Sequence, residues 1–137
     1  MNLLLTLLIG VCLWEPIMIR GSTEPTIKTV YQACIDNNLL YPEIVTAQSI
    51  LETGYYSSKV CKEYNNILGL YNSRTNSYYQ FSHWKECIRQ YKKLVEYKYK
   101  PIQLSEEEYL VFLETLPYAL DSMYTKKIKI LVAKHFW

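Results

Sequence analysis

Apolar residues recur at three- and four-residue steps along most of the chain, which is the period of an amphipathic helix. The first such stripe predicts a helix that begins near residues 22–25 and ends at Asn37 and Asn38. Its apolar members are Ile27, Val30, Tyr31 and Cys34. A second helix should begin at Pro42, because proline is favoured at the first helical position, and should end before Gly54.

The pattern changes after the second helix. Residues 57–63 have the composition of a short turn, which leads to Asn65 and Asn66. Between Leu70 and Phe81, aromatic residues that favour strands flank a polar segment at 72–77. This arrangement predicts a small β-hairpin.

Three further apolar stripes predict three more helices. Ser82 is placed to cap the first of them, and Ser105 with Glu108 forms a capping box for the second. Pro117 should end that helix, and Asp121 is placed to cap the last one. The predicted fold is therefore mainly α, with one short β-hairpin.

The chain begins with an apolar run from Leu3 to Leu13. Its eleven residues are too few to cross a bilayer, which takes ~20, but they suit the core of a signal peptide. We therefore expect residues 1–21 to be a signal peptide or N-terminal anchor, and residues 22–137 to form one domain. The predicted location is secreted or in the cell envelope. Cys12 leaves a lipid anchor, and hence membrane association, open.

The composition narrows the class of protein. Hydrophobic residues make up 50% of the sequence and charged residues 20%, which is typical of an ordered globular protein. A net charge of +2 is small for a dedicated nucleic-acid-binding protein, so we expect no nucleic-acid partner. The 14 tyrosines offer flat faces for stacking on sugar rings, although helical spacing should place most of them in the core. We expect the protein to act as a monomer.

Beyond the leader the chain has three cysteines, Cys34, Cys61 and Cys87. An odd number argues against a complete disulfide framework, and their apolar neighbours favour buried thiols. His83 and His135 are far apart in the sequence, and no two cysteines have metal-ligand spacing. We therefore predict no metal site and no cofactor.

Glu52 is an unfavourable residue for its predicted position. It lies in the last turn of the second helix, where the helix dipole disfavours a carboxylate by ~0.3–1 kcal/mol. The apolar face formed by Ile44, Ala47 and Leu51 should also bury part of it. Both effects raise the pKa of the carboxyl group. A carboxyl group that stays protonated near neutral pH is what the general acid of a glycosidase requires. The alternative is a solvated glutamate at a helix end.

Four segments carry a family resemblance. Residues 47–54 (AQSILETG) are similar to an A-Q-x-x-L-E-[ST]-G helix end, and residues 65–70 (NNILGL) are similar to an N-N-L-F-G turn. Residues 81–88 (FSHWKECI) are similar to F-x-x-W-x-E-S-I, and residues 118–124 (YALDSMY) to Y-A-x-D-x-x-Y. In this order the segments resemble the glucosaminidase family of bacterial autolysins and flagellar-rod muramidases. The resemblance implies a lysozyme-like fold, a helical body with a short β element and a cleft between them.

The resemblance also implies an activity. It is that of a peptidoglycan hydrolase, an endo-β-N-acetylglucosaminidase that cleaves β-1,4 bonds of the glycan strands. By position, it implies that Glu52 is the general acid and that Tyr118 is a second catalytic residue facing the scissile bond. Asn66 lies in the turn that braces the site. The residues predicted to bind substrate are Asn66, Gln48, Tyr71 and Tyr79.

One departure from the family pattern leaves alternatives open. Several family members supply a second carboxylate from the β element, but no Asp or Glu lies between Glu63 and Glu86. The role of this second carboxylate would fall to the acetamido group of the substrate, to Tyr118 with a positioned water, or to a carboxylate from elsewhere. A lytic transglycosylase, which needs one Glu on a similar fold, is the alternative enzyme. A catalytically decayed protein that binds the cell wall is the non-enzymatic alternative.

Overall fold

The computed structural model describes residues 24–99, 105–116 and 120–137. The predicted leader, and with it Cys12, lies outside the described residues, as does Tyr118. The helices are α1 (Ile27–Asp36), α2 (Pro42–Thr53), α3 (Lys59–Tyr64), α4 (Trp84–Leu94), α5 (Glu106–Glu114) and α6 (Tyr124–Phe136), with a 3₁₀ turn η1 at Glu96–Lys98. Strands β1 (Tyr71–Asn72) and β2 (Ser77–Tyr78) form an antiparallel hairpin in which Tyr71 pairs with Tyr78. The predicted mainly α fold with one short hairpin is confirmed.

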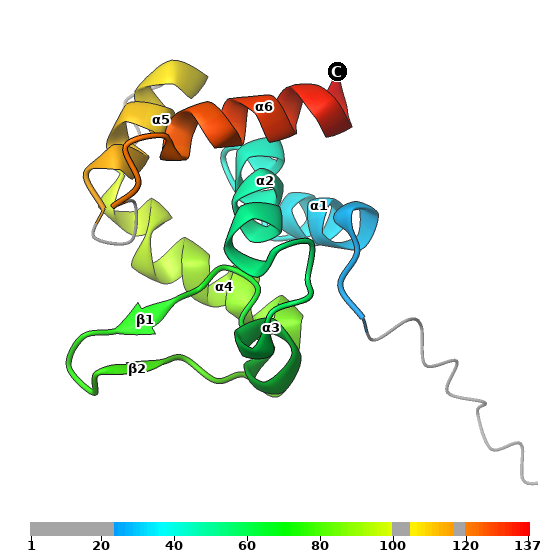
Figure 1. The fold of residues 1–137 in the computed structure, drawn as a ribbon, viewed down its shortest axis with the longest axis vertical. Coiled ribbons are helices and arrows are strands. Elements are labelled where there is room, and N and C mark those ends of the chain that lie inside the picture. Colours follow the sequence, from blue (N-terminus) through cyan, green and yellow to red (C-terminus); the bar gives the residue numbers. More distant parts are fainter. Residues whose placement is uncertain (1–23, 100–104, 117–119) are drawn as a thin grey trace, which may run out of the picture.

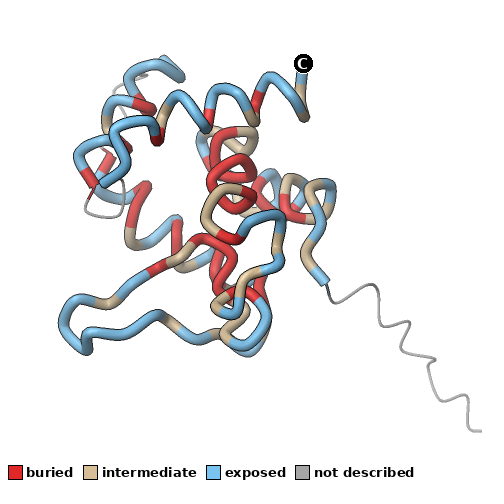
Figure 2. Tube along the Cα trace, viewed as in Figure 1, coloured by how far each residue is buried: buried red, intermediate tan, exposed pale blue. Residues whose placement is uncertain are grey.

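Helix α2 forms the centre of the domain. Helix α1 packs beside it and α6 crosses it, while the hairpin extends away from the helices (Figure 1). Figure 2 shows that α2 is buried along most of its length, whereas the hairpin is largely exposed. The sequence predicted one buried face for α2. Its other sides are buried as well. The polar side chains there can be buried because the hydroxyl groups of Thr46, Ser49 and Thr53 donate to backbone carbonyls three or four residues earlier, at 2.6–2.7 Å.

Several predicted helix ends are confirmed. Helix α2 begins at Pro42, and Gly54 follows it in the left-handed conformation, at φ 55°, where its N–H donates to the carbonyl of Ile50. The capping box of Ser105 and Glu108 begins α5. Helix α1 starts later than predicted, because a capping box at Thr26 determines its first turn.

The predicted turn at residues 57–63 is wrong in part, since most of it is the short helix α3. The hydroxyl of Ser58 accepts from the N–H of Cys61 and so caps the first turn. Asn65 ends the helix in the left-handed conformation, at φ 52°. The side chain of Asn65 then donates to the carbonyl of Phe81 at 3.0 Å, which ties the end of α3 to the end of the hairpin.

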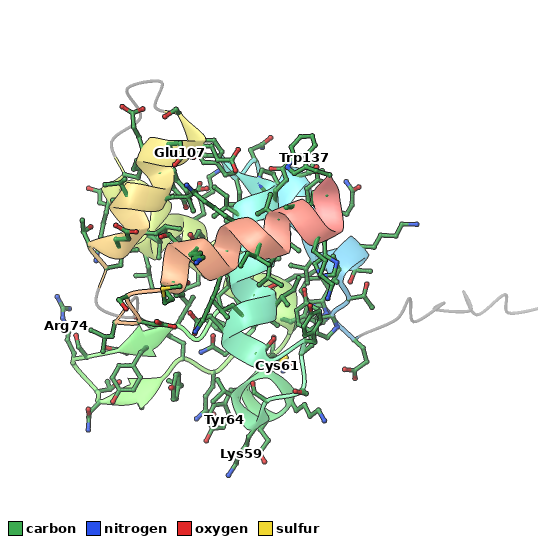
Figure 3. The ribbon with its side chains drawn as sticks, turned by 45° about the horizontal axis from the view of Figure 1, so that its top comes forward. Lys59, Cys61, Tyr64, Arg74, Glu107 and Trp137 are labelled. Carbon is green, nitrogen blue, oxygen red and sulfur yellow. The ribbon has the colours of Figure 1, made fainter. Side chains whose placement is uncertain are left out.

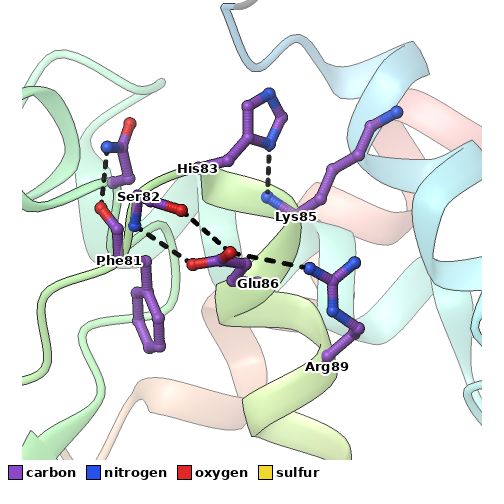
Figure 4. A network of polar contacts seen from close by, with 7 residues as sticks. Phe81, Ser82, His83, Lys85, Glu86 and Arg89 are labelled. Carbon is purple, nitrogen blue, oxygen red and sulfur yellow. Dashed lines mark hydrogen bonds and ion pairs between the residues drawn. The ribbon is translucent and has the colours of Figure 1, made fainter.

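Two predicted caps are corrected. The N-cap of α4 is His83, whose Nδ1 accepts from the N–H of Lys85, and Ser82 instead donates twice to the carboxylate of Glu86 (Figure 4). These donors hold the pKa of Glu86 below its usual range. Asp121 lies one turn before α6, where it accepts from the N–H of Met123. Asp121 thus accepts from a backbone N–H as a cap would, but in the turn that precedes α6, whereas Ser82 acts as a donor and not as a cap.

The core lies between α1, α2, α4, α5 and α6, and the predicted buried thiols belong to it. Cys34, Cys61 and Cys87 are all buried and free. Burial raises the pKa of the Cys34 and Cys87 thiols to about 12, so neither is a reactive thiolate near neutral pH. Of the helices in the described ranges, none is long and apolar enough to cross a membrane.

Candidate active site

Glu52 lies where the last turn of α2 meets the loop that precedes the hairpin. Its carboxyl oxygen Oε1 accepts a hydrogen bond from the hydroxyl of Tyr124, at 3.1 Å, from the first residue of α6. Its second oxygen, Oε2, faces Gly69, where an added Cβ would lie 3.1 Å away. Gly69 has φ +60°, so both its backbone conformation and this close approach favour glycine. One oxygen of Glu52 is therefore held by a donor, and the other has room only because residue 69 lacks a side chain.

A buried chain of polar side chains continues behind Tyr124. The side-chain amide of Gln48 donates to the hydroxyl of Tyr124 at 3.1 Å, and the hydroxyl of Tyr91 donates to Oε1 of Gln48 at 2.8 Å. The hydroxyls of Tyr91 and Tyr109 lie 2.8 Å apart. An amide has one donor end and one acceptor end, and Gln48 therefore gives this chain a direction in which the hydroxyl of Tyr124 accepts from Gln48 and donates to Glu52.

The surroundings of Glu52 favour its protonated form. Burial raises the pKa of the Glu52 carboxyl group, and the hydrogen bond from Tyr124 opposes this rise because it stabilises the ionised form. The net direction is upward, as the sequence predicted from the helix end and the adjoining apolar face. A raised pKa makes this carboxyl group a better candidate for a proton donor than a solvated glutamate.

The carboxyl group of Glu52 opens into a cleft of about 770 Å³. The hairpin lines one part of it with Tyr71, Tyr78 and Tyr79, and the segment from Leu94 to Lys98 lines another. Glu52 is the one carboxylate among the described residues that line this cleft. A volume of this size lies within the range of ligand-binding clefts in proteins.

The tyrosines of the hairpin are available to a ligand. Tyr71 is 47% exposed and meets Tyr78 edge to face, with ring centroids 5.2 Å apart. Tyr79 is half-buried and stacks on Phe81. Two of the predicted substrate-binding residues, Tyr71 and Tyr79, thus line the same cleft as Glu52.

Asn66 and Gln48 occupy a different position from the two tyrosines. Asn66 has no exposed surface; its Nδ2 donates to the carbonyls of Leu70 and Tyr79, and its Oδ1 accepts from the N–H of Leu70, all at 2.9 Å. Gln48 is 1% exposed inside the chain of polar groups behind Glu52. Neither side chain has surface with which to touch a substrate in this structure. Asn66 thus lies beneath the hairpin and Gln48 behind the acid, and a role of either residue in substrate binding stays a prediction.

Sequence reasoning missed two residues that touch Glu52. Tyr124 closes the motif at residues 118–124, but its place on an apolar stripe concealed a hydroxyl that reaches Glu52. Gly69 stands in the N-N-I-L-G turn, and its proximity to the acid has no local signal. Within the part of the chain that the structure describes, no three His, Cys, Asp or Glu side chains gather as a metal site.

A carboxyl group with a raised pKa, at the base of a tyrosine-lined cleft in a helical domain, is the arrangement of a glycoside hydrolase. A family model described as mannosyl-glycoprotein endo-β-N-acetylglucosaminidase matches residues 28–135. The chain belongs to this glucosaminidase family.

The fold has a counterpart among solved structures. The catalytic domain of the autolysin Auto from Listeria monocytogenes is similar, with a TM-score of 0.58 and 19% sequence identity. The similarity covers 79% of this chain and 81% of that one, and it shows a shared fold. A comparison with curated proteins finds no match.

Proposed function

We propose that this protein is a peptidoglycan hydrolase of the cell envelope, an endo-β-N-acetylglucosaminidase that uses Glu52 as its general acid. The observation that carries the proposal is the environment of Glu52: burial raises the pKa of its carboxyl group, Tyr124 orients it, and it opens to a tyrosine-lined cleft. The description of the matching family, which names an endo-β-N-acetylglucosaminidase, supports this choice of activity. The fold shared with an autolysin catalytic domain favours bacterial cell-wall glycan as the polymer.

The geometry of Glu52 indicates which oxygen carries the proton. Because Oε1 accepts from Tyr124, the acidic hydrogen belongs on Oε2, beside Gly69. In the first step Oε2 would give this proton to the oxygen that leaves as the glycosidic bond breaks. The ionised carboxylate that remains keeps its hydrogen bond from Tyr124, which stabilises the charge formed in that step.

The second group in the reaction would come from the substrate. Glu52 is the one carboxylate among the described cleft-lining residues, and a retaining mechanism with a protein nucleophile needs another ~5–5.5 Å away. The 2-acetamido oxygen of the sugar can attack the anomeric carbon instead, since its covalent attachment already holds it close. Water then attacks the same carbon, giving its proton to Glu52 and releasing the acetamido oxygen. We propose that Tyr118 hydrogen-bonds the acetamido group during these steps.

A Glu52→Gln variant tests the assignment. It keeps the shape of the side chain and an acceptor for Tyr124 but cannot donate an acidic proton, so turnover should fall by roughly 10²–10⁴-fold or more. Thermal melting should show an intact or slightly more stable fold, because a poorly solvated carboxyl group has been removed. Equal clearing of peptidoglycan by both proteins would exclude Glu52 as the acid.

The lone carboxylate of the cleft also favours a second candidate, a lytic transglycosylase. In that reaction a hydroxyl of the sugar itself attacks the anomeric carbon, and no second carboxylate is needed. Mass spectrometry of muropeptides after digestion separates the two activities. Our proposal requires reducing N-acetylglucosamine ends, whereas 1,6-anhydro-N-acetylmuramic acid ends would establish the transglycosylase.

Three further expectations accompany the proposed function. The glycan strands of peptidoglycan are the proposed partner, and we propose that the protein works as a monomer. The location in the cell envelope or outside the cell rests on the kind of substrate. Export through residues 1–21 stays a prediction from their apolar run.

A further inference from the structure

The cleft carries positive charge away from Glu52. Arg74 lies at the outer end of the hairpin (Figure 3), and Lys98 is the last residue of η1. Both line the cleft, and both are exposed. The described lining residues thus include two cations and one carboxyl group, that of Glu52, which accepts a hydrogen bond from Tyr124 at the end of α2.

Neither cation has an ion-pair partner among the described residues. The ion pairs in the described ranges join other residues, namely Lys59–Glu63, Arg89–Glu86, Lys127–Asp121 and Lys129–Glu107. The hairpin turn is also held without the guanidinium group of Arg74, because Asn72 accepts from the backbone N–H of Arg74 and Tyr71 donates to Asn76. The positive ends of Arg74 and Lys98 are therefore available to an anion bound in the cleft.

We infer that Arg74 and Lys98 bind a carboxylate carried by the glycan, so that the enzyme prefers charged strands to an uncharged polymer of N-acetylglucosamine. The inference rests on the proposed function and adds the chemical class of the substrate. Peptidoglycan carries carboxylates on its peptide stems and, where the peptides have been removed, on the lactyl groups of the glycan. The planar fork of an arginine matches a carboxylate with two parallel hydrogen bonds, and a lysine adds a mobile point charge.

The experiment compares three substrates. These are intact peptidoglycan, glycan strands freed of peptides, and an uncharged N-acetylglucosamine oligomer. Arg74→Gln and Lys98→Gln should each lower kcat/KM on charged substrates about three- to fivefold at low salt, mainly through KM, because exposed ionic contacts are modest. The double variant should lose about tenfold. At ~0.5 M salt the difference from wild type should shrink, since screening shortens the range of the interaction.

Lys62→Gln and Lys93→Gln are the matched controls. Each removes one positive charge from an exposed position that does not line the cleft, so each should behave as wild type on all three substrates. The test and control substitutions are also made in a Glu52→Gln background. Co-sedimentation of these inactive variants with insoluble peptidoglycan then measures binding independently of turnover.

The outcomes separate the two levels of the proposal. A loss on intact peptidoglycan alone supports contact with the peptide stems, and an equal loss on peptide-free strands supports contact with the lactyl carboxylates. An unchanged KM on charged substrates, or the same loss on the uncharged oligomer, would overturn the inference. If the wild type cleaves none of the three polymers, the proposed function fails instead.

Discussion

Replacing Gly69 with alanine tests the geometry of the acid most directly. The new Cβ would lie 3.1 Å from Oε2 of Glu52, and Gly69 has φ +60°. Ordinary van der Waals contacts of a Cβ begin at about 3.4 Å, so the carboxyl group must shift by a few tenths of an ångström. Oε2 is the oxygen to which we assign the acidic proton, so this shift displaces the group that reacts.

Gly69→Ala should cause two separate losses, one in stability and one in rate. An alanine held in the left-handed conformation costs roughly 1–2 kcal/mol of stability, wherever in the fold it lies. Displacement of a reacting group by a full ångström can cost about 10²-fold in rate, so a few tenths should cost about tenfold in kcat. The first loss belongs to the backbone, and the second belongs to the contact with Glu52.

Gly54→Ala provides the control that separates these parts. Gly54 has nearly the same backbone conformation, at φ +55°, but its added Cβ would meet the hydroxyl of Ser57, at 3.3 Å, and not the acid. Both variants should therefore lose similar stability in chemical denaturation. In a steady-state assay on a soluble glycan, Gly69→Ala alone should lose about tenfold in kcat. If the two variants are equally active, crowding of Oε2 does not limit the reaction and our placement of the proton is wrong.

Three further predictions concern buried polar groups. Tyr124→Phe removes the hydrogen bond that favours ionised Glu52, so the pKa of this carboxyl group should rise further. The alkaline limb of the pH–rate profile should then move to higher pH, and an unmoved limb would contradict the role of Tyr124. Burial raises the pKa of the Glu96 carboxyl group, so the stability that Glu96 contributes to the fold is lost as pH rises through that raised pKa. Glu96→Gln keeps an acceptor for the N–H of Leu40, and should therefore raise Tm at pH 7 and weaken the pH dependence of unfolding. A lower Tm at pH 7 would contradict this prediction. Asn66→Ala leaves three backbone groups without their partner and should cost about 2–4 kcal/mol in denaturant unfolding, with a cost below 1 kcal/mol counting against its bracing role.

The local parts of the fold could be predicted because their causes are local. Pro42 and Gly54 mark the two ends of α2 through backbone preferences that hold in any fold, and Ser105 with Glu108 marks the start of α5. The same reasoning located Glu52 at a helix end beside apolar residues, from which the direction of its pKa followed. Each of these predictions needs only residues within a few positions of one another.

The features of the fold and site that the sequence did not predict depend on contacts between distant segments. Helix α3 is short, and its six residues carry no periodic signal, so it was predicted as a turn. Tyr124 lies on an apolar stripe in the sequence, yet its hydroxyl reaches an acid 72 positions earlier because α6 crosses α2. The place of Asn66 in a motif predicts a role in substrate binding, but nothing local predicts that the path of the hairpin buries its side chain completely. Such partners follow from helix packing, which local patterns do not encode.

The site consists of a buried part, which holds the acid, and an exposed part, which lines the cleft. The polar chain that ends on Glu52 takes Gln48 from α2, Tyr91 from α4, Tyr109 from α5 and Tyr124 from α6, so four packed helices fix the acid together. The hairpin supplies exposed tyrosines and Arg74 but no carboxylate. Because buried groups are costly to displace while exposed ones adapt, changes in the polar chain should act mainly on kcat, and changes in the hairpin mainly on KM. A fold built in this way can alter the glycan it accepts through its hairpin without disturbing the acid.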